Sequence, residues 1–508
     1  MLHLFDRFRA DRRGNVALTF GLAVLPLTMA VGMGIDITNA TRTRLALQDA
    51  TDTAALALVR QASTVPSGQE AATAQNYVQA SFSSKAPLTV TSATIDRQTI
   101  TAEIETRADV PVYFSKLFGV STIPVTSRSV AQGMQDEIAL VLDTSGSMSQ
   151  SAGTGGPKIT ALKDAADSFL DTLFGDNLTT SRVAVSITPF AASVNVGSAN
   201  RNASWIDGSG KSSLAAEDFS GGGKTRFNLF DEMNTAWGGC VISRPSAKDY
   251  DITDTAPNPS DGDSLFVPWF APDEPDTGSG FTNNYIPDAG GNCGSQSSQI
   301  LASPGLRQSN TCKYMNATPK AGLGPNVLCD SQPITALSSN HSALTTAVGA
   351  LKAKGNTNIL EGFMWGWRSL SPGAPFGGGR PYNTPNNRKV IVLMTDGQNN
   401  FGTVNNADMS RYSSFGYAVR GRIAPPTTDN NALDAAMDGR TQKACANAKA
   451  QGLIIYTIAF GADAAGSKSL LQGCASDPTY FYAPQNSSDL KPVFLKIAES
   501  IKALRIAQ

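Results

Sequence analysis

The segment Ile138-Ala-Leu-Val-Leu-Asp-Thr-Ser-Gly-Ser-Met148 joins a continuous apolar run to a short string of polar side chains. The apolar run predicts a strand that is buried on both faces, as strands in the middle of a parallel sheet are. Asp143, Ser145 and Ser147 follow it directly and alternate with turn residues. Because open α/β sheets bind their ligands beyond the carboxyl ends of the strands, we expect one carboxylate and two hydroxyls to converge there.

Two later segments carry oxygen ligands in a similar setting. Lys354-Gly-Asn-Thr-Asn358 is a polar loop that contains Thr357, and Val390-Ile-Val-Leu-Met-Thr-Asp-Gly397 is a second apolar strand that ends in Asp396. Carboxylate and hydroxyl oxygens without His or Cys favour Mg²⁺, with Mn²⁺ or Ca²⁺ as alternatives, over zinc or copper. The predicted metal ligands are Asp143, Ser145, Ser147, Thr357 and Asp396.

This ligand set fills most of the coordination shell of such an ion and leaves one position for an oxygen from outside. A partner protein that presents an acidic side chain would complete the shell. The alternative is a structural ion, or a vacant site that only ties three loops together.

The DxSxS string at residues 143–147, followed in chain order by the threonine loop and the second aspartate, resembles the metal-ion-dependent adhesion site of von Willebrand factor A domains. The resemblance implies an α/β fold with a doubly wound, mostly parallel sheet within residues 136–508. Helical and strand patterns alternate there, as this fold requires. The expected helices are Lys158–Phe174, Leu337–Leu351, Ile359–Leu370, Leu433–Ala450 and Leu490–Ile506, and the expected further strands are Arg182–Thr188, Leu453–Phe460 and Tyr480–Ala483.

The alternation stops between residues 190 and 333, a stretch rich in Gly, Ser, Asn, Asp and Pro. Structureless loops of that length are rare in a compact domain, so we expect an inserted subdomain that carries partner specificity, with a decorative excursion as the alternative. Within it, Pro268-Trp-Phe270 and Pro272-Asp-Glu-Pro-Asp276 are expected to form an exposed aromatic and acidic string that serves as a ligand for the ion.

The six cysteines contain no CxxC pair, which favours disulfides in an exported protein over a zinc site. Cys445 and Cys474 lie on either side of the predicted strand Leu453–Phe460, and we expect them to form one disulfide, with two free thiols as the alternative. The remaining four allow three pairings, and the sequence does not choose between them. These four are Cys240, Cys293, Cys312 and Cys329.

The N-terminal region predicts a membrane anchor. Residues 14–35 contain no charged side chain, and at about 1.5 Å per residue a helix of this length spans the roughly 30 Å hydrocarbon core. We therefore expect a transmembrane helix at residues 14–36, after a cytoplasmic basic segment at residues 1–13. The alternative is a cleaved signal peptide, although the apolar run is longer than usual for one. The basic residues are Arg7, Arg9, Arg12 and Arg13, against Asp6 and Asp11.

Residues 37–132 predict an exported helix and a small β-rich stalk. The helix extends to Arg60 without Gly or Pro after Asp36, and residues 88–130 alternate in strand fashion. Val112–Phe118 predicts a short helix that ends at Gly119. This α+β module is similar to a pilin, and a simple spacer is the alternative.

Arg13-Gly-Asn-Val-Ala-Leu-Thr-Phe20, the apolar run with Pro26, and Asp49-Ala-Thr-Asp-Thr-Ala-Ala-Leu-Ala57 resemble the N-terminal segment of TadE/TadG-like proteins. Those proteins belong to the Flp (tight-adherence) pilus assembly system. The resemblance implies partners among pilus-assembly components.

Composition excludes several classes of function. The net charge of −1 argues against nucleic-acid binding, and His3 and His341, the only histidines, leave no basis for a Ser-His-Asp or HExxH site. We therefore predict a non-enzymatic, cation-dependent adhesion or assembly component of the inner membrane, crossing it once, with its main domain in the periplasm or at the surface. The alternative is a periplasmic scaffold or chaperone-like protein, which fractionation and surface labelling would distinguish.

Overall fold

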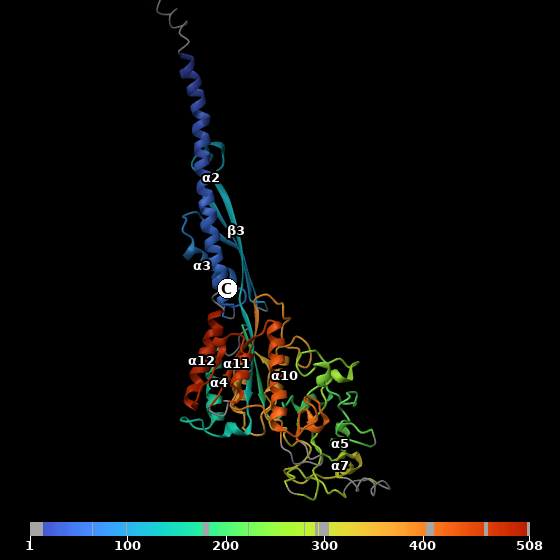
Figure 1. The fold of residues 1–508 in the computed structure, drawn as a ribbon. Coiled ribbons are helices and arrows are strands. Elements are labelled where there is room, and N and C mark those ends of the chain that lie inside the picture. Colours follow the sequence, from blue (N-terminus) through green and yellow to red (C-terminus); the bar gives the residue numbers. More distant parts are fainter. Residues whose placement is uncertain are drawn as a thin grey trace, which may run out of the picture. The chain divides into compact units, whose positions relative to one another are not determined.

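The structure, a computed structural model, describes residues 14–62, 64–97, 99–175, 182–221, 223–278, 280–289, 293, 304–402, 411–461 and 466–504. The chain divides into two compact units, residues 1–134 and 135–508 (Figure 1). The basic segment predicted at residues 1–13 lies outside the described residues.

The first unit is built on one long helix, α2 (Gly14–Arg60), which Pro26 does not interrupt. Helix α3 (Glu70–Ser81) follows, and then an antiparallel sheet in the order β1 (Leu88–Asp96), β2 (Thr101–Pro111) and β3 (Thr122–Gln132). The sheet lies along the C-terminal half of α2, as Figure 1 shows for β3. Leu47, Ala50 and Leu58 of α2 are buried beneath this sheet and α3.

The N-terminal half of α2 has a different surface. Phe20, Leu22, Leu27 and Val31 are exposed, so the apolar run has little protein cover in this unit. Within the described part of the chain, this is the one helix long and apolar enough to cross a membrane, a criterion that a signal sequence also meets.

The loop between β2 and β3 corrects one prediction. The expected helix at Val112–Phe118 is a 3-10 turn that covers only Ser115–Phe118, ending at Gly119 with φ +82°. The backbone N–H groups of Tyr113, Phe114 and Ser115 donate to the carboxylate of Asp36 in α2. The carboxylate of Asp36 therefore accepts the hydrogen bonds that a preceding helical turn would otherwise accept from these N–H groups.

The second unit confirms the mixed α/β architecture. Among its described residues, six strands form one sheet in the order β11–β10–β7–β4–β5–β6. All neighbouring pairs are parallel except β5 with β6. The strands are β4 (Gln135–Asp143), β5 (Val183–Phe190), β6 (Thr335–Ser338), β7 (Asn387–Thr395), β10 (Ile454–Ala459) and β11 (Phe481–Tyr482), and a separate two-stranded ribbon pairs β8 (Tyr412–Ser413) with β9 (Gly416–Tyr417).

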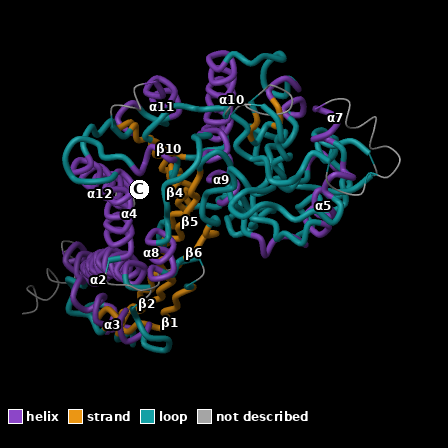
Figure 2. The backbone as a smooth tube through the Cα atoms, turned by 90° about the horizontal axis from the view of Figure 1, so that it is seen from below, coloured by secondary structure: helices purple, strands orange, loops and turns teal. Residues whose placement is uncertain are grey.

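Helices cover both faces of this sheet (Figure 2). Alternate residues of β4 serve the two faces: Leu140 packs in the cluster with α4, α8 and α12, whereas Val141 packs in the cluster with α9, α10 and α11. This explains why residues 138–142 of the strand are apolar at every position. The helices are α4 (Lys158–Phe174), α5 (Arg226–Glu232), α7 (Pro304–Ser309), α8 (His341–Gly349), α9 (Ile359–Ser369), α10 (Asn430–Ala450), α11 (Lys468–Cys474) and α12 (Ser487–Leu504).

Two helix predictions need correction. Leu337 was expected to begin a helix, but it lies in the antiparallel edge strand β6, and α8 begins only at His341. The side chain of Asn340 accepts a hydrogen bond from Ala343 N–H and caps α8 there. Helix α11 was not predicted, because its seven residues are too few to establish a helical period.

The segment between β5 and β6 packs against the rest of the second unit. Its aromatic side chains join the hydrophobic cluster of α9, where the ring centroids of Phe266 and Trp365 lie 4.6 Å apart. In its described part, side chains hydrogen-bond backbone groups that are not paired in helices or sheets. Arg244, for example, donates to the carbonyl oxygens of Thr255 (2.7 Å) and Tyr250 (2.9 Å).

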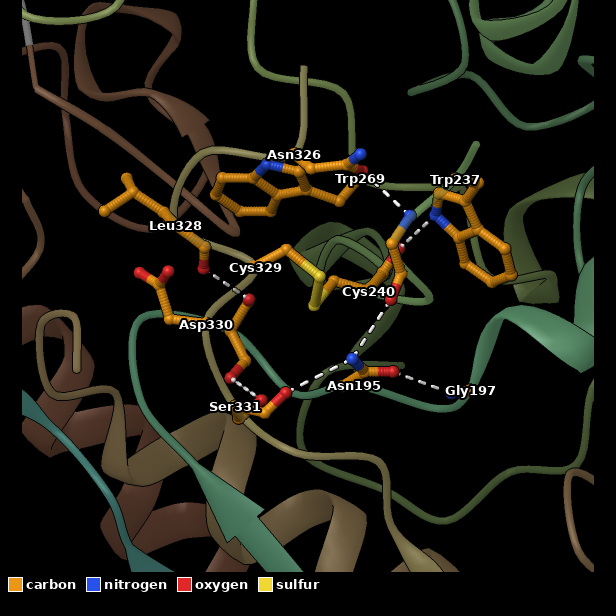
Figure 3. Close-up of a disulfide and its surroundings, with 12 residues drawn as sticks. Asn195, Gly197, Trp237, Cys240, Trp269, Asn326, Leu328, Cys329, Asp330 and Ser331 are labelled. Carbon is orange, nitrogen blue, oxygen red and sulfur yellow. Dashed lines mark hydrogen bonds between the residues drawn. A yellow bond between two sulfur atoms is a disulfide. The ribbon is translucent and has the colours of Figure 1, made fainter. Parts of the chain in front are cut away.

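All six cysteines are paired in the structure. Cys445 of α10 bonds Cys474 of α11, as predicted, and the pairings that the sequence left open are Cys240–Cys329 and Cys293–Cys312. Figure 3 shows Cys240–Cys329 with Trp237 close by, whose indole N–H donates to Cys240 O at 2.8 Å.

Replacing both Cys445 and Cys474 by Ser should lower the free energy of unfolding by about 3–4 kcal/mol, because a bridge across 29 residues restricts the unfolded chain. Urea unfolding followed by tryptophan fluorescence measures this, since all five tryptophans lie in the second unit. Identical midpoints for the double variant and the oxidised wild type would contradict the prediction.

Candidate metal site

Backbone hydrogen bonds join the predicted ligand loops at the carboxyl edge of the sheet. Gly146 N–H, in the loop after β4, donates to Gly355 O at 2.8 Å, and Lys354 N–H donates to Thr144 O at 2.8 Å. Asn400 N–H, in the loop after β7, donates to Thr357 O at 2.9 Å. Three segments distant in the sequence therefore meet at one place.

The predicted ligand side chains of the first and third loops are hydrogen-bonded to one another. The hydroxyls of Ser145 and Ser147 lie 3.0 Å apart, and Ser147 Oγ donates to Asp396 Oδ1 at 2.7 Å. Asp143 accepts from the N–H of Ser145 at 2.7 Å and from the hydroxyl of Thr395 at 2.6 Å. Thr395, the neighbour of Asp396, was not among the predicted site residues.

Thr357 is buried beside the third loop. A methyl group built on Gly397 would lie 3.7 Å from Thr357 Oγ1, which places this hydroxyl next to the residue that follows Asp396. All five predicted ligands therefore belong to one cluster of contacting loops. Asp143 and Asp396 are fully buried, while Ser147 and Gly397 are partly exposed and form the rim.

A lysine completes the site, although the sequence pattern around it predicted only a helix. Lys158, the first residue of α4, is 2% exposed, and its ammonium donates to Asp396 Oδ2 at 2.9 Å. One sequence signal points to it. A cation at the first helical position faces the positive end of the helix dipole, which is unfavourable unless an acidic group lies nearby.

The charges of the site fit a divalent cation. Two carboxylates are buried in the described cluster, and the ammonium of Lys158 pairs with one of them, Asp396. Burial and the negative charge of Asp396 raise the pKa of Asp143 to about 7, against the hydrogen bonds from Thr395 and Ser145. The donor atoms are hard oxygens, which suit Mg²⁺, Mn²⁺ or Ca²⁺. Within the described residues, no cluster of three or more His, Cys, Asp or Glu side chains offers a competing site.

The segment between β5 and β6 reaches the threonine loop. Asp330, which follows Cys329, lies 2.7 Å from the ammonium of Lys354. Figure 3 shows Asp330 beside the Cys240–Cys329 disulfide. A cavity of about 130 Å³ lies between this segment and the loop, and Asn356 beside Thr357 is part of its lining. Other lining residues are Glu274, Asn283, Leu328, Tyr412 and Tyr417.

Much of the string that was expected to be exposed is instead part of the core. Trp269 and Phe270 are fully buried, and the Trp269 indole donates to Val327 O at 2.9 Å. Asp273 is also buried, in an ion pair with Lys313. The prediction that these residues are exposed was therefore wrong for Trp269, Phe270 and Asp273. Glu274 and Asp276 remain partly or fully exposed, and a contact between them and the ion stays a prediction.

Several solved structures are similar to this chain at low identity. They include the vWF domain of the type V pili tip protein Mfa5 from Porphyromonas gingivalis (10% identity, 74% of this chain, 97% of that chain, TM-score 0.34). The pilus adhesin SpaC from Lactobacillus rhamnosus GG shares 12% identity over 82% of this chain and 34% of that chain, with a TM-score of 0.34. The PilB minor pilin from Streptococcus sanguinis shares 13% over 83% and 80%, with a TM-score of 0.31.

At these TM-scores the likenesses carry no argument about fold or function. No curated protein matches the sequence. A family model does match the N-terminal segment, and the matched residues have the same bounds as α2, which includes the apolar run. Residues 14–60 match the family described as putative Flp pilus-assembly TadE/G-like, which confirms the resemblance predicted over roughly residues 7 to 60.

Proposed function

We propose that this chain is a membrane-anchored protein that binds a partner through a divalent cation and acts in adhesion or assembly of an Flp/Tad pilus. The observation that carries the proposal is the meeting of Asp143, Thr357 and Asp396 from three distant segments at one sheet edge. This arrangement supports a von Willebrand factor A-like domain with a doubly wound sheet. The proposed function is binding, without a catalytic step.

The bound cation, most simply Mg²⁺, would offer an electrophilic position to an acidic side chain of the partner. Asp143 and Asp396 would hold the ion with the hydroxyls of Ser145, Ser147 and Thr357. Contact with a carboxylate in a partly buried site is stronger than an exposed ion pair, because water competes less. The neighbouring segment with Asp330 and the cavity beside Asn356 would select among partners.

The anchor part of the proposal depends on α2. Its exposed apolar half and its match to a pilus-assembly family support a single span of the bacterial inner membrane. The N-terminus would remain in the cytoplasm, and the chain that follows the span would fold in the periplasm or reach the surface. Pilus components are then the proposed partners.

Ion binding can be tested directly with Mn²⁺, followed by electron paramagnetic resonance on the full chain in detergent. We expect one tightly bound ion per chain and at least a roughly tenfold loss of affinity in Thr357→Ala, since one hydroxyl ligand is removed. Thr346→Ala is the matched control, because that hydroxyl lies on the exposed face of α8. Equal affinity in wild type and Thr357→Ala would contradict the site.

Partner binding needs a separate measurement. Pilin subunits should co-purify with the wild type in Mg²⁺, and recovery should fall in EDTA and in Thr357→Ala. Equal recovery from all three samples would contradict ion-mediated binding even if the ion itself binds.

A further inference from the structure

The loop of residues 112–121, here called the hairpin tip, presents an apolar surface outside the core of the first unit. Its one charged side chain is Lys116. Exposed apolar patches of this kind mark contacts with proteins or membranes. Its exposed large side chains, between 41% and 75% accessible, are Tyr113, Phe114, Leu117, Phe118 and Val120.

The hairpin tip is held to α2 by Asp36, the first charged residue after the apolar run. The carboxylate accepts hydrogen bonds from the N–H groups of Tyr113 (3.0 Å), Phe114 (3.0 Å) and Ser115 (2.7 Å). The hydroxyl of Ser115 donates to it at 2.9 Å. Asp36 is 1% exposed, so its charge is compensated by four donors instead of by water.

The contact of Phe114 with α2 fixes the position of the hairpin tip along the helix axis. A methyl group built on Gly32 would lie 2.4 Å from Phe114 Cγ, so the ring rests directly on the backbone of α2 there. Gly32 lies one helical turn inside the apolar run, about 6 Å before Asp36 along the axis. The aromatic side chains therefore adjoin the exposed apolar surface of α2 at Val31 and Ile35.

We propose that the hairpin tip enters the interfacial layer of the bilayer, on the side of the folded units, and that Asp36 holds it there. The inference rests on the proposed anchoring by α2. Tyr and Phe side chains favour the membrane–water interface, and Lys116 can extend its ammonium toward the headgroups. The apolar surface of the hairpin tip continues that of the helix, which makes lipid the occupant that fits both. The contact would fix the orientation of the β2–β3 hairpin relative to the membrane surface.

The test uses the full chain in phosphatidylcholine–phosphatidylglycerol nanodiscs. Since all six native cysteines are paired, a single introduced cysteine can carry an environment-sensitive fluorophore. Leu117→Cys probes the hairpin tip and Val31→Cys the helix. Val130→Cys is the matched control, because Val130 is an exposed apolar residue at the other end of β3, next to Ala131, which packs on the C-terminal part of α2.

We expect doxyl-labelled lipid to quench the probes at Leu117→Cys and Val31→Cys at least about threefold more than the probe at Val130→Cys. Quenching at Val31→Cys but not at Leu117→Cys would overturn this inference and leave the anchor intact. A Leu117→Cys probe shielded from aqueous iodide yet insensitive to doxyl lipid would show that protein covers the hairpin tip, which also overturns it. No quenching at any position would overturn the anchor as well.

The role of Asp36 has its own readout. Combining Asp36→Ala with Leu117→Cys removes the acceptor for four donors, so lipid quenching at the hairpin tip should fall by at least about half. The same substitution combined with Val31→Cys should leave quenching in the helix unchanged. Unchanged quenching in both would overturn the role of Asp36.

Discussion

Mg²⁺ at a hundredfold excess over its dissociation constant should stabilise the metal-free protein by about 2.7 kcal/mol, which raises the unfolding temperature of the second unit by several degrees. The physical reason is that the ion relieves the repulsion between Asp143 and Asp396, both of which are fully buried. Differential scanning fluorimetry on the full chain, with tryptophan emission as the signal, measures the shift.

Asp143→Asn should abolish this shift, because it keeps a side-chain acceptor for Ser145 N–H but removes a negative charge from the ligand set. Ser149→Ala is the matched control: its hydroxyl lies two residues beyond Ser147, is exposed, and bonds only Gly146 O among its described contacts. The control should respond to Mg²⁺ as the wild type does. A full shift in Asp143→Asn would place the stabilising ion elsewhere.

Lys158→Met should lower the free energy of unfolding of the metal-free protein by about 3–5 kcal/mol, because it leaves the buried carboxylate of Asp396 without its ion-pair partner. Lys163→Met, on the same helix, removes an ammonium that donates to Gly349 O near the surface and should cost less than about 1 kcal/mol. Urea unfolding with tryptophan fluorescence compares the two.

The same variant separates an electrostatic role from a packing role. Without Lys158, two uncompensated carboxylates remain, so Mg²⁺ should stabilise Lys158→Met more than it stabilises the wild type. If Lys158 acts only by filling space, methionine will replace it with little loss and an unchanged Mg²⁺ response. That result would remove Lys158 from the site.

Much of the second unit follows from contiguous patterns. The apolar run at residues 138–142 predicted β4, and the spacing of apolar residues predicted α4 over Lys158–Phe174 with the bounds that the structure has. The ligand loops were likewise recognisable, because the oxygen donors follow their strands directly in the chain. Short elements were less predictable. Helix α11 spans barely two turns, and the edge strand β6 is so short that its last residues were assigned to the helix after it.

Sequence alone determined the parts whose physics is local: the continuous apolar run that buries both faces of β4, the oxygen chemistry after it, and the uncharged run at the start of α2. Tertiary structure decided the rest, namely the pairing of Cys240 with Cys329, the burial of Trp269, the ion pair of Lys158 with Asp396 and the capture of the hairpin tip by Asp36. Each of these joins residues more than 50 positions apart, and the cost or gain of such a contact depends on which distant segment removes the group from water.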